Sequence, residues 1–437
     1  MSGDDCFEIL NKIFKAKNPE SIENIKGYTI KYGNIIDENK KIVDEVLVSY
    51  FKAPKSYTTE NMCEINTHGG VVILRNILDL CLKNGANLAE PGEFTKRAFL
   101  NGRIDLLQAE SVIDIIHAKS EKEAKNSINQ LEGHLSKKIN EIKQKIMNVM
   151  VNVEVAIDYP EYDEGDATNE ELLNMFSEVK SDLTRLEASF DNGKIIKEGI
   201  KTAIIGRPNA GKSSLLNAIL KEERAIVTDI EGTTRDTIEE FVNINGIPLK
   251  LVDTAGIRET DNEVEKIGVV KSKKIANDAD LIIAIFDSSK DLTDEDKEIL
   301  DIIKGKKVII VLNKIDLENK IDEKNEYLKN VSDNIVKISA LNETGIENIY
   351  DKINEMFNLS EINLDNETVI TNLRHKNLIS KAIENVNKAE ETLENGMPTD
   401  VIAIFIKDIL EALGEITGEE VTENIINEIF ARFCLGK

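Results

Sequence analysis

Hydrophobic side chains recur every three or four positions through the middle and the end of the chain. The two longest stripes consist of Leu135, Ile139, Ile142, Ile146, Val149 and Val153, and of Leu172, Phe176, Val179, Leu183, Leu186 and Phe190. This spacing predicts long amphipathic helices whose apolar faces form the core of a bundle. The glycine of Asp191-Asn192-Gly193 is predicted to cap the second helix. Helical spacing resumes over about residues 366–433, so one helical region is interrupted.

The interruption has a different pattern, in which short apolar runs alternate with helical segments from about residue 199 to 357. The runs that indicate buried strands are Lys201–Ile205, Pro248–Val252, Val308–Leu312 and Ile335–Ile338. Alternation of strand and helix predicts a mostly parallel, doubly wound α/β sheet. The interpretation is therefore a complete α/β domain inserted into an all-α domain.

The start of the chain predicts a small α/β domain. Asp4–Ala16 has helical spacing, and Tyr28–Tyr32, Val43–Phe51 and Asn61–Asn66 have strand patterns. A second helix is expected after His68-Gly69-Gly70. The predicted fold is thus multidomain, α/β plus all-α, with domains at residues 1–102, 103–198, 199–358 and 359–437. The second and fourth of these form the helical bundle that the third interrupts.

The inserted domain carries a glycine-rich loop of the kind that binds phosphate. Gly206–Ser213 reads G-R-P-N-A-G-K-S between a predicted strand and a predicted helix, which a P-loop requires and a chance glycine-rich turn does not. Backbone amides and the helix N-terminus would face the phosphates, Lys212 would reach the β- and γ-phosphates, and the Ser213 hydroxyl would ligate Mg²⁺. The predicted nucleotide contacts are Asn209, Ala210, Gly211, Lys212, Ser213 and Ser214.

Three downstream motifs, in the order found in GTPase domains, indicate which nucleotide binds. Asp253-Thr254-Ala255-Gly256 follows a predicted strand, where its aspartate would support the Mg²⁺ shell and its glycine amide would contact the γ-phosphate. Asp316 of Asn313-Lys314-Ile315-Asp316 would accept both N1–H and N2–H₂ of guanine, a pattern that adenine lacks. Ser339-Ala340-Leu341 would close over the base. The predicted domain is a Ras-like GTPase, and its nucleotide is GTP.

The usual residue for hydrolysis is missing. Ile257 follows the Asp253–Gly256 motif, where Ras-like proteins have a glutamine that orients the attacking water. Glu265, on the loop that follows, is a candidate to orient or polarise this water, and the alternative for it is an exposed helix charge. Thr234 of Gly232-Thr233-Thr234-Arg235-Asp236 would ligate Mg²⁺ in the GTP state.

A monovalent cation is the second candidate device for hydrolysis. The amide oxygen of Asn209 would coordinate it between the α- and γ-phosphates, and backbone carbonyls of a later loop would complete the cage. That loop consists of Thr228, Asp229, Ile230, Glu231, Gly232 and Thr233. The ion would do the electrostatic work of an arginine finger. GTP turnover is therefore expected to be much faster in K⁺ than in the smaller Na⁺.

Composition restricts the partners and the compartment. The chain has 437 residues, 31% of them charged, and a net charge of −25, which by itself argues against a broad nucleic-acid surface and for protein or small-molecule partners. The four cysteines and four histidines show no metal-type spacing, which suits a reducing cytoplasm. No apolar run approaches the length of a membrane span, so no membrane partner is expected.

Two further segments carry candidate chemistry. An amide-rich turn beside Glu64 can bind a small ligand, although a core strand with an ordinary turn is the better interpretation of the pattern alone. Cys434 lies in the closing segment Phe433-Cys434-Leu435-Gly436-Lys437. It is either a reactive thiol on a flexible tail or an unused thiol at a helix end, and chemistry alone favours the second.

These motifs together resemble the MnmE (TrmE) family of tRNA-modification GTPases over essentially the whole chain. The marks are His68-Gly69-Gly70, Pro91-Gly92-Glu93-Phe94, Arg97-Ala98-Phe99-Leu100-Asn101, the G-R-P-N-A-G-K-S and G-T-T-R-D loops, Gly414–Glu419 and the closing Cys434-Leu435-Gly436-Lys437. The terminal C-x-G-K together with an inserted GTPase domain is the specific combination. The family's usual opening segment is absent before Met1, so a member shortened at its N-terminus is expected.

The resemblance implies a folate-binding N-terminal domain that also forms a homodimer, and K⁺-dependent pairing of the GTPase domains. It implies a heterotetramer with a flavin- and NADH-using protein of the MnmG (GidA) type. The two proteins together would build an aminomethyl or carboxymethylaminomethyl group at C5 of the wobble uridine of certain tRNAs. A tetrahydrofolate derivative, in the 5-formyl or the 5,10-methylene form, would supply the carbon.

The resemblance also implies residue roles, by motif match alone. The implied K⁺ ligands are Asn209, Thr228, Ile230 and Thr233, and the implied Mg²⁺ ligands are Ser213 and Thr234. The implied catalytic residues are Glu265, for handling the water, and Cys434, for the modification reaction. The residues that fall where the family binds folate are Glu64, Arg103 and Lys437.

Two other functions compete with this interpretation. A ribosome-assembly GTPase of the Era or Der type would need a KH-like RNA-binding domain or a second GTPase domain, and the sequence shows neither. A nucleotide-switched scaffold with negligible turnover is compatible with Ile257, and a turnover assay in K⁺ separates it from an enzyme. The leading interpretation is a GTPase whose cycle of dimerisation and hydrolysis drives tRNA modification.

Overall fold

The computed structural model describes residues 1–18, 27–158, 169–222, 240–244, 246–252, 276–359 and 369–437. The chain forms two compact units, each described here by itself. The first consists of Met1–Ile113, Gln130–Asp166 and Glu391–Lys437, and the second of Asp114–Asn129 and Ala167–Glu390. Of the helices in the described ranges, none is long and apolar enough to cross a membrane.

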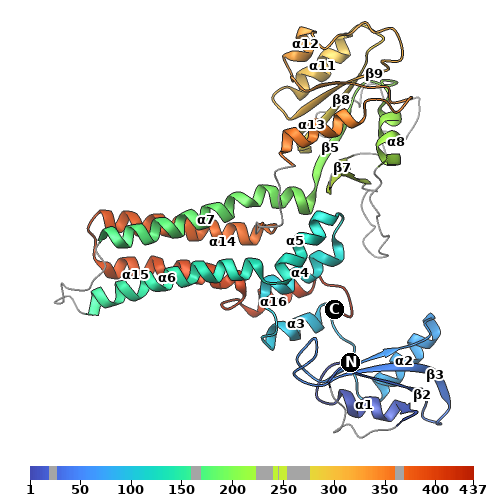
Figure 1. The fold of residues 1–437 in the computed structure, drawn as a ribbon, viewed down its shortest axis with the longest axis vertical. Coiled ribbons are helices and arrows are strands. Elements are labelled where there is room, and N and C mark those ends of the chain that lie inside the picture. The colour runs from blue at the N-terminus through green and yellow to red at the C-terminus, as the bar shows by residue number, and fades with distance from the viewer. Residues whose placement is uncertain (19–26, 159–168, 223–239, 245, 253–275, 360–368) are drawn as a thin grey trace. The chain divides into compact units, whose positions relative to one another are not determined.

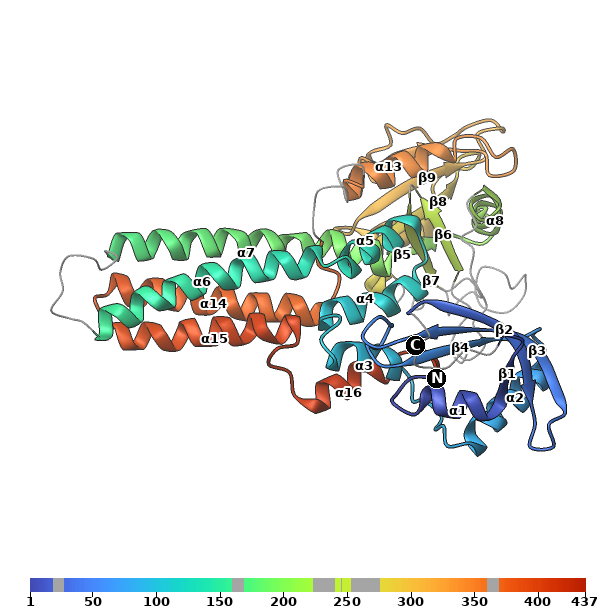
Figure 2. The same ribbon diagram turned by 60° about the horizontal axis from the view of Figure 1, so that its bottom comes forward.

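An antiparallel sheet in the order β1-β2-β3-β4 opens the first unit (Figure 2). The first elements are α1 (Cys6–Ile13), β1 (Phe14–Ala16), β2 (Thr29–Ile36), β3 (Ile42–Phe51), β4 (Met62–Asn66) and α2 (Val71–Lys83). Alternate β3 residues, Val46 and Val48, are buried with Leu10 of α1 and Ile77 of α2. The predicted helix over Asp4–Ala16 is too long, because its last residues pair with β2 as a strand.

Helices complete the first unit. They are α3 (Glu93–Leu100), most of α4 (Leu106–His117), α6 (His134–Asp158), α15 (Thr399–Thr417) and α16 (Glu423–Phe430). Helix α6 packs along α15, and the predicted apolar stripe of α6 is buried there, with Ile139, Ile142 and Ile146 completely inaccessible. An ion pair between Lys143 Nζ and Glu419 Oε2, at 2.6 Å, supports this contact. The prediction of a long amphipathic core helix is confirmed.

The second unit contains a six-stranded sheet in the order β10-β9-β8-β5-β7-β6 (Figure 1). Its strands are β5 (Ile200–Ile205), β6 (Glu240–Ile244), β7 (Ile247–Val252), β8 (Leu281–Asp287), β9 (Val308–Asn313) and β10 (Ile335–Lys337). All neighbours are parallel except β6 and β7. Its helices are α8 (Lys212–Glu222), α11 (Asp294–Ile303), α12 (Glu326–Lys329) and α13 (Glu347–Phe357).

Both faces of this sheet are covered by apolar clusters. Ile283 and Ile285 of β8 belong to one cluster, and Ile282 and Ala284 belong to the other. Strand β5 lies between β7, to which the chain leads first, and β8, which follows later. The carboxyl end of β5 is therefore at the point where the strand order reverses, which is where doubly wound sheets bind their ligands. The predicted fold class is confirmed: an N-terminal α/β part and helical segments, with a doubly wound domain inserted between them.

Three long helical segments also belong mainly to the second unit: α5 (Glu121–Leu131), α7 (Asn169–Glu198) and α14 (Leu373–Glu394). Helix α7 corrects the predicted C-cap at Gly193, because it continues to Glu198 and leads directly into β5. A Cβ atom at Gly193 would lie 1.9 Å from the carbonyl oxygen of Ile370. This glycine therefore does not end the helix. Its missing side chain allows the segment before α14 to pack closely against α7.

Candidate functional site

The glycine-rich loop lies where β5 ends and α8 begins, at the carboxyl edge of the parallel strands. Asn209 and Gly211 have positive φ angles, of 60° and 106°. A Cβ atom would lie 2.4 Å from the carbonyl oxygen of Ile285 at Gly206, and 2.0 Å from Nδ2 of Asn313 at Gly211. Both glycines are therefore required by close contacts with the ends of β8 and β9, which shape the loop for phosphate.

Lys212 is one of two cations in this loop, beside Arg207. Its Nζ donates hydrogen bonds of 2.7 Å to the carbonyl oxygens of Gly206 and Arg207. Burial lowers the pKa of Lys212, because its charge faces only neutral carbonyls in these two contacts. An anion in the loop would therefore stabilise this charge more than the carbonyls do. Ser213 and Ser214, the other predicted contacts of this segment, lie in the first turn of α8.

Asn313 joins the glycine-rich loop to the predicted base-binding loops. Its side chain is buried, with 2% exposed. Nδ2 donates to the carbonyl oxygen of Ala210 at 2.8 Å, and Oδ1 accepts from the backbone N–H of Ala340 at 2.9 Å. The donor and the acceptor of this side-chain amide thus each form a hydrogen bond to a different loop. One loop is predicted to bind the phosphates and the other to bind the base. The buried amide therefore fixes the separation of the phosphate and base regions.

Lys314 and Asp316 belong to the predicted base-binding region. Lys314 has a positive φ of 69°, and its Nζ donates to the carbonyl oxygen of Asn209 at 2.9 Å and to Asp287 Oδ2 at 2.7 Å. Asp316 Oδ1 accepts a hydrogen bond of 2.6 Å from the Ser339 hydroxyl. The structure thus brings the three described motifs together, and it leaves the Asp316 carboxylate with further acceptor capacity for guanine.

Two residues of this region were missed by the sequence analysis. Asp287 ends β8 beside Asn313 in the sheet register; burial opposes its charge, but hydrogen bonds from Lys314 and Ser289 lower its pKa overall. Arg207 anchors the glycine-rich loop through an ion pair of 2.7 Å to Glu295. An aspartate at the end of a buried strand was the available signal for Asp287. Arg207 had no such signal, because its partner is distant in sequence.

The remaining GTPase predictions fall outside the described residues. They concern Thr228, Asp229, Ile230, Glu231, Gly232, Thr233, Thr234, Asp253, Thr254, Ala255, Gly256 and Glu265. Of the implied ion ligands, only Asn209 and Ser213 lie in the described part of the chain, and the Asn209 side chain is exposed. These ligand roles stay predictions.

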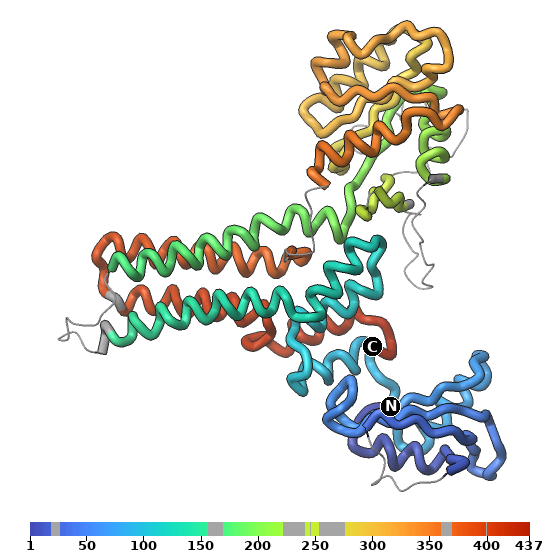
Figure 3. The backbone as a smooth tube through the Cα atoms, viewed as in Figure 1, coloured from blue at the N-terminus to red at the C-terminus, as the bar shows by residue number. Residues whose placement is uncertain are grey.

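A second group of predicted residues gathers in the first unit. The backbone N–H of Phe94 donates to the carbonyl oxygen of Lys437 at 3.0 Å, and that of Gly92 donates to Cys434 at 3.4 Å. Gly92 has a φ of 70°, and a Cβ atom there would lie 2.8 Å from the carbonyl oxygen of Phe430. The C-terminal tail, the red end of the tube in Figure 3, therefore docks on the Pro91–Phe94 turn. Cys434 is half-buried at this contact.

Glu64 and Arg103 lie on the surface of the same unit. Glu64 is exposed on β4, opposite Ser49 of β3. Arg103 is also exposed; it donates to the carbonyl oxygen of Tyr57 at 3.1 Å, and its guanidinium lies 4.7 Å from the centre of the Tyr57 ring. Within the described ranges, no hydrogen bond or ion pair joins Glu64, Arg103 and the Lys437 side chain. Their common role stays a prediction.

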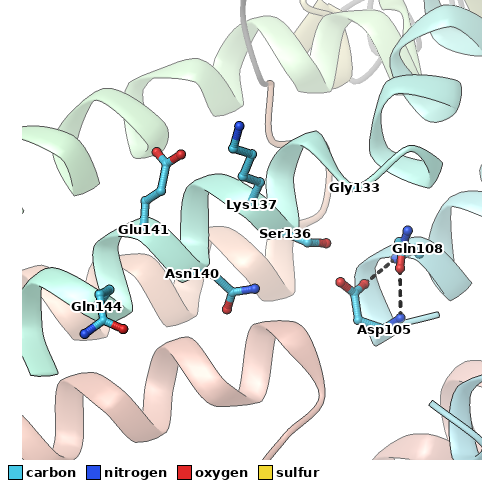
Figure 4. Close-up of a pocket in the computed structure, with 8 residues that line it drawn as sticks. All are labelled: Asp105, Gln108, Gly133, Ser136, Lys137, Asn140, Glu141 and Gln144. Carbon is cyan, nitrogen blue, oxygen red and sulfur yellow. Dashed lines mark hydrogen bonds between the residues drawn. The ribbon is translucent and has the colours of Figure 1, made fainter. Parts of the chain in front are cut away.

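A separate pocket lies between the start of α4 and the first turns of α6 (Figure 4). Its lining residues are Asp105, Gln108, Gly133, Ser136, Lys137, Asn140, Glu141 and Gln144, none of them predicted from the sequence. Lys137 and Glu141 point to one side of α6, whereas Asn140 and Gln144 point to another. These side chains do not converge on one ligand. The part of the chain that the structure describes also contains no cluster of potential metal ligands.

Family models match most of the chain. The model described as GTP-binding protein TrmE N-terminus matches residues 1–103, and the model described as MnmE helical domain matches residues 106–434. The tRNA modification GTPase MnmE of Thermoanaerobacter pseudethanolicus is 51% identical over 440 residues, covering 100% of this chain and 95% of the relative. The protein of the same name from Clostridioides difficile is 51% identical over 438 residues, with the same two coverages.

Solved structures match parts of the chain. The G domain of the T. maritima FeoB iron transporter is 28% identical, and the match covers 36% of this chain and 97% of that domain, with a TM-score of 0.27. A TM-score this low carries no conclusion. The relatives, in contrast, match along 100% of this chain at about half identity, and the two family models match residues on both sides of the inserted domain. The chain therefore belongs to the MnmE (TrmE) family.

Proposed function

We propose that this chain binds and hydrolyses GTP in the service of tRNA modification, the activity for which its MnmE relatives are named. The observation that carries the proposal is the Asn313 amide, which ties the phosphate loop at Ala210 to the base loop at Ala340. A ribosome-assembly GTPase is not favoured, because the matched family models cover residues outside the GTPase domain.

The described residues fit a guanine nucleotide with Mg²⁺. Lys212 would bind the β- and γ-phosphates and Asp316 the guanine edge, while Gly211, Ser213 and Ser214 would present amides and a hydroxyl at the start of α8. Bound Mg²⁺ would neutralise charge on the phosphates. Thr234 and the Asp253–Gly256 motif are proposed for the remaining Mg²⁺ and γ-phosphate contacts, and Glu265 for the attacking water.

A K⁺ ion is proposed as the activator of hydrolysis. The Asn209 side chain fits this role, because it is exposed on a left-handed residue of the phosphate loop. No hydrogen bond of its carboxamide occurs within the described ranges. Thr228, Ile230 and Thr233 are the other proposed ligands. The ion would supply positive charge between the phosphates where this chain has Ile257 in place of the usual glutamine.

The test is GTP turnover by the full chain in K⁺ and in Na⁺ at equal ionic strength. We expect turnover in K⁺ to be faster by at least about tenfold, since a correctly placed cation replaces an arginine finger. Lys212→Met is the control, because it should abolish turnover in both salts. Equal rates in the two salts would remove the K⁺ proposal, and negligible turnover in both would favour the nucleotide-switched scaffold.

The first unit is proposed to bind the one-carbon donor. A tetrahydrofolate derivative offers N–H donors on its pterin ring and carboxylates on its glutamate tail. The exposed carboxylate of Glu64 and the exposed cations Arg103 and Lys437 have the complementary chemistry. Docking of the C-terminal tail on Pro91–Phe94 supports a role for Cys434 in the modification reaction of the same unit.

The proposed assembly is a homodimer formed through domain 1–102, combined with an MnmG/GidA-type flavin protein and acting on tRNA in the cytoplasm. Its product would be an aminomethyl or carboxymethylaminomethyl group at C5 of the wobble uridine. In this division, residues 103–198 and 359–437 are the helical domain, and residues 199–358 are the GTPase domain. The high net negative charge, −25, favours a partner that supplies most of the basic surface for tRNA.

A further inference from the structure

Helix α5 and the residues just before it belong with the GTPase sheet, although their sequence neighbours do not. Asp114–Asn129 falls in the second compact unit, whereas the chain up to Ile113 and the chain from Gln130 both belong to the first. The chain therefore leaves the first unit within α4, contacts the GTPase part through α5 (Figure 1), and returns to the first unit before α6.

Two lysines, Lys122 of α5 and Lys119 just before it, contact the β6–β7 hairpin. The stem of Lys122 lies over Gly246, where a Cβ atom would be 2.9 Å from Lys122 Cγ. Its Nζ donates to the carbonyl oxygen of Leu359 at 3.2 Å, and burial lowers the pKa of this lysine. Lys119 Nζ lies 4.2 Å from the centre of the Phe241 ring of β6. The β6–β7 hairpin is thus contacted at two places: Lys122 packs on its turn, and Lys119 packs on an aromatic ring of β6.

This hairpin adjoins two segments that are proposed to contact the γ-phosphate and its ions. Strand β6 begins at Glu240, shortly after the segment that carries Thr234, and β7 ends at Val252, immediately before Asp253. Strand β7 also pairs with β5, which leads into the phosphate loop. If the contacts of either segment change when nucleotide binds, the adjoining strand, β6 or β7, would be displaced, and both strands belong to the hairpin that α5 contacts.

The segment Asp114–Asn129 has a charged contact to the start of the GTPase domain, from the end of α4, and a buried charged group of its own in α5. Asp114 forms an ion pair of 2.7 Å with Lys197, which precedes β5 by only a few residues. Glu123 is buried, with 5% exposed, and accepts a hydrogen bond of 2.6 Å from the backbone N–H of Lys119. The ion pair therefore joins the end of α4 to the segment before β5, whereas the Glu123 hydrogen bond stabilises the start of α5 itself.

We propose that α5 couples the nucleotide state of the GTPase domain to the helical domain, with Lys122 as the positioning residue that docks the β6–β7 hairpin. GTP would shift the hairpin through the two segments that flank it, and α5 would follow because Lys122 holds Gly246 and Leu359. The covalent continuations of α5 into α4 and α6 would carry the shift into the first unit. The inference rests on the proposed GTPase function, since only a bound nucleotide supplies the differential contacts.

Hydrogen exchange of the α5 amides in the full chain tests this coupling. Exchange is compared without nucleotide and with saturating GMPPNP, Mg²⁺ and K⁺, and binding is measured separately with a fluorescent GTP analogue. We expect GMPPNP to change the exchange rates of α5 at least threefold or so, because the opening free energy of a coupled element depends on the ligand. A chain that binds GMPPNP without any change in α5 would overturn the coupling.

Variants separate coupling from simple destabilisation. Lys122→Gln should remove the response of α5 to GMPPNP while nucleotide affinity stays within about twofold, and Lys122→Arg should restore the response because it keeps the cation and the donor. Glu121→Gln, which changes an exposed charged residue at the start of the same helix, is the control and should respond like the wild type. A full response in Lys122→Gln would overturn the role of Lys122. Failure of the wild type to bind the analogue would instead refute the proposed function itself.

Discussion

Asn313 joins two loops of the predicted nucleotide site through one buried side chain. Its buried amide satisfies one group of the phosphate loop and one of the base loop, so neither loop can move away without exposing an unpaired polar atom. The sequence motif predicted that Asn313 belongs to the base region. That it also fixes the phosphate loop was not predictable, because the contact depends on how closely Gly211 approaches β9.

Asp316→Asn tests the assignment of guanine. The carboxylate accepts from Ser339 in the structure and would accept two donors from guanine, whereas an amide turns a donor toward the base. Each lost charge-assisted hydrogen bond is worth about 1.5–3 kcal/mol, so GDP affinity should fall on the order of 10²-fold or more, as measured by titration calorimetry. Asp301→Asn, at an exposed carboxylate of α11, should bind GDP normally. Unchanged affinity in Asp316→Asn would contradict the guanine assignment.

At the residue level, the sequence predicted which residues share a loop where a motif is contiguous, while their ligand roles stay predictions. The glycines and Lys212 of the phosphate loop meet at the predicted place because strand, loop and helix are contiguous. Asp287 and Arg207 were missed, because their partners Lys314 and Glu295 come from other elements of the sheet. The C-terminal tail at Pro91–Phe94 is a similar case, since nothing local indicates which turn it contacts.

At the scale of elements, the four strands predicted for the GTPase sheet agree with β5, β7, β9 and β10 within one residue at each end. Strands β6 and β8 were not predicted, and the predicted strand Tyr28–Tyr32 is too short, because β2 continues to Ile36. A parallel sheet covered on both faces produces continuous apolar runs with clear limits. Two further errors lie where a distant segment decides the conformation. Phe14–Ala16 continues a helical pattern but pairs with β2, and Gly193 resembles a cap but lies inside α7.

Gly193→Ala tests the packing of α7. Alanine is a better helix former than glycine by about 1 kcal/mol, so propensity alone predicts stabilisation. The new Cβ would meet the Ile370 carbonyl oxygen at 1.9 Å, and such overpacking typically costs about 1–3 kcal/mol. We therefore expect a net loss of stability in thermal or urea unfolding. Asn192→Ala, at the exposed neighbouring position, should be neutral or slightly stabilising. Stabilisation by Gly193→Ala would contradict the close contact.

Glu123→Gln tests the buried end of α5 through its pH dependence. Burial raises the pKa of Glu123 to about 7, and the charged groups around it are Lys119, Asp114 and Lys197. The folded chain therefore retains a proton that the unfolded chain releases above its ordinary pKa. The stability that Glu123 contributes is present at low pH and is lost as the pH rises through about 7.

The neutral amide of glutamine does not have this dependence. Relative to the wild type, Glu123→Gln should gain stability between pH 5 and pH 8, on the order of 3 kcal/mol, in urea unfolding at the two pH values. Glu121→Gln, at the exposed start of the same helix, should show no such gain. An equal difference from the wild type at both pH values would contradict the raised pKa of Glu123.

At the scale of the whole molecule, the order of the parts follows from the sequence, but the grouping of the helices does not. Periodicity predicts that helical segments surround a doubly wound domain, and the structure and the family models agree. It does not predict that Asp114–Asn129 groups with the sheet while α6 groups with α15. Amphipathic faces specify that a helix is buried, not which partner buries it.

The central claim is that the GTPase cycle of this chain serves modification of the tRNA wobble uridine. The most direct measurement is mass spectrometry of tRNA nucleosides from cells that lack the chain, complemented with the wild type, Lys212→Met or Cys434→Ser. The account predicts loss of the C5-aminomethyl-type uridines in the deletion, recovery with the wild type, and no recovery with either variant. Unchanged levels of these nucleosides in the deletion strain would contradict it.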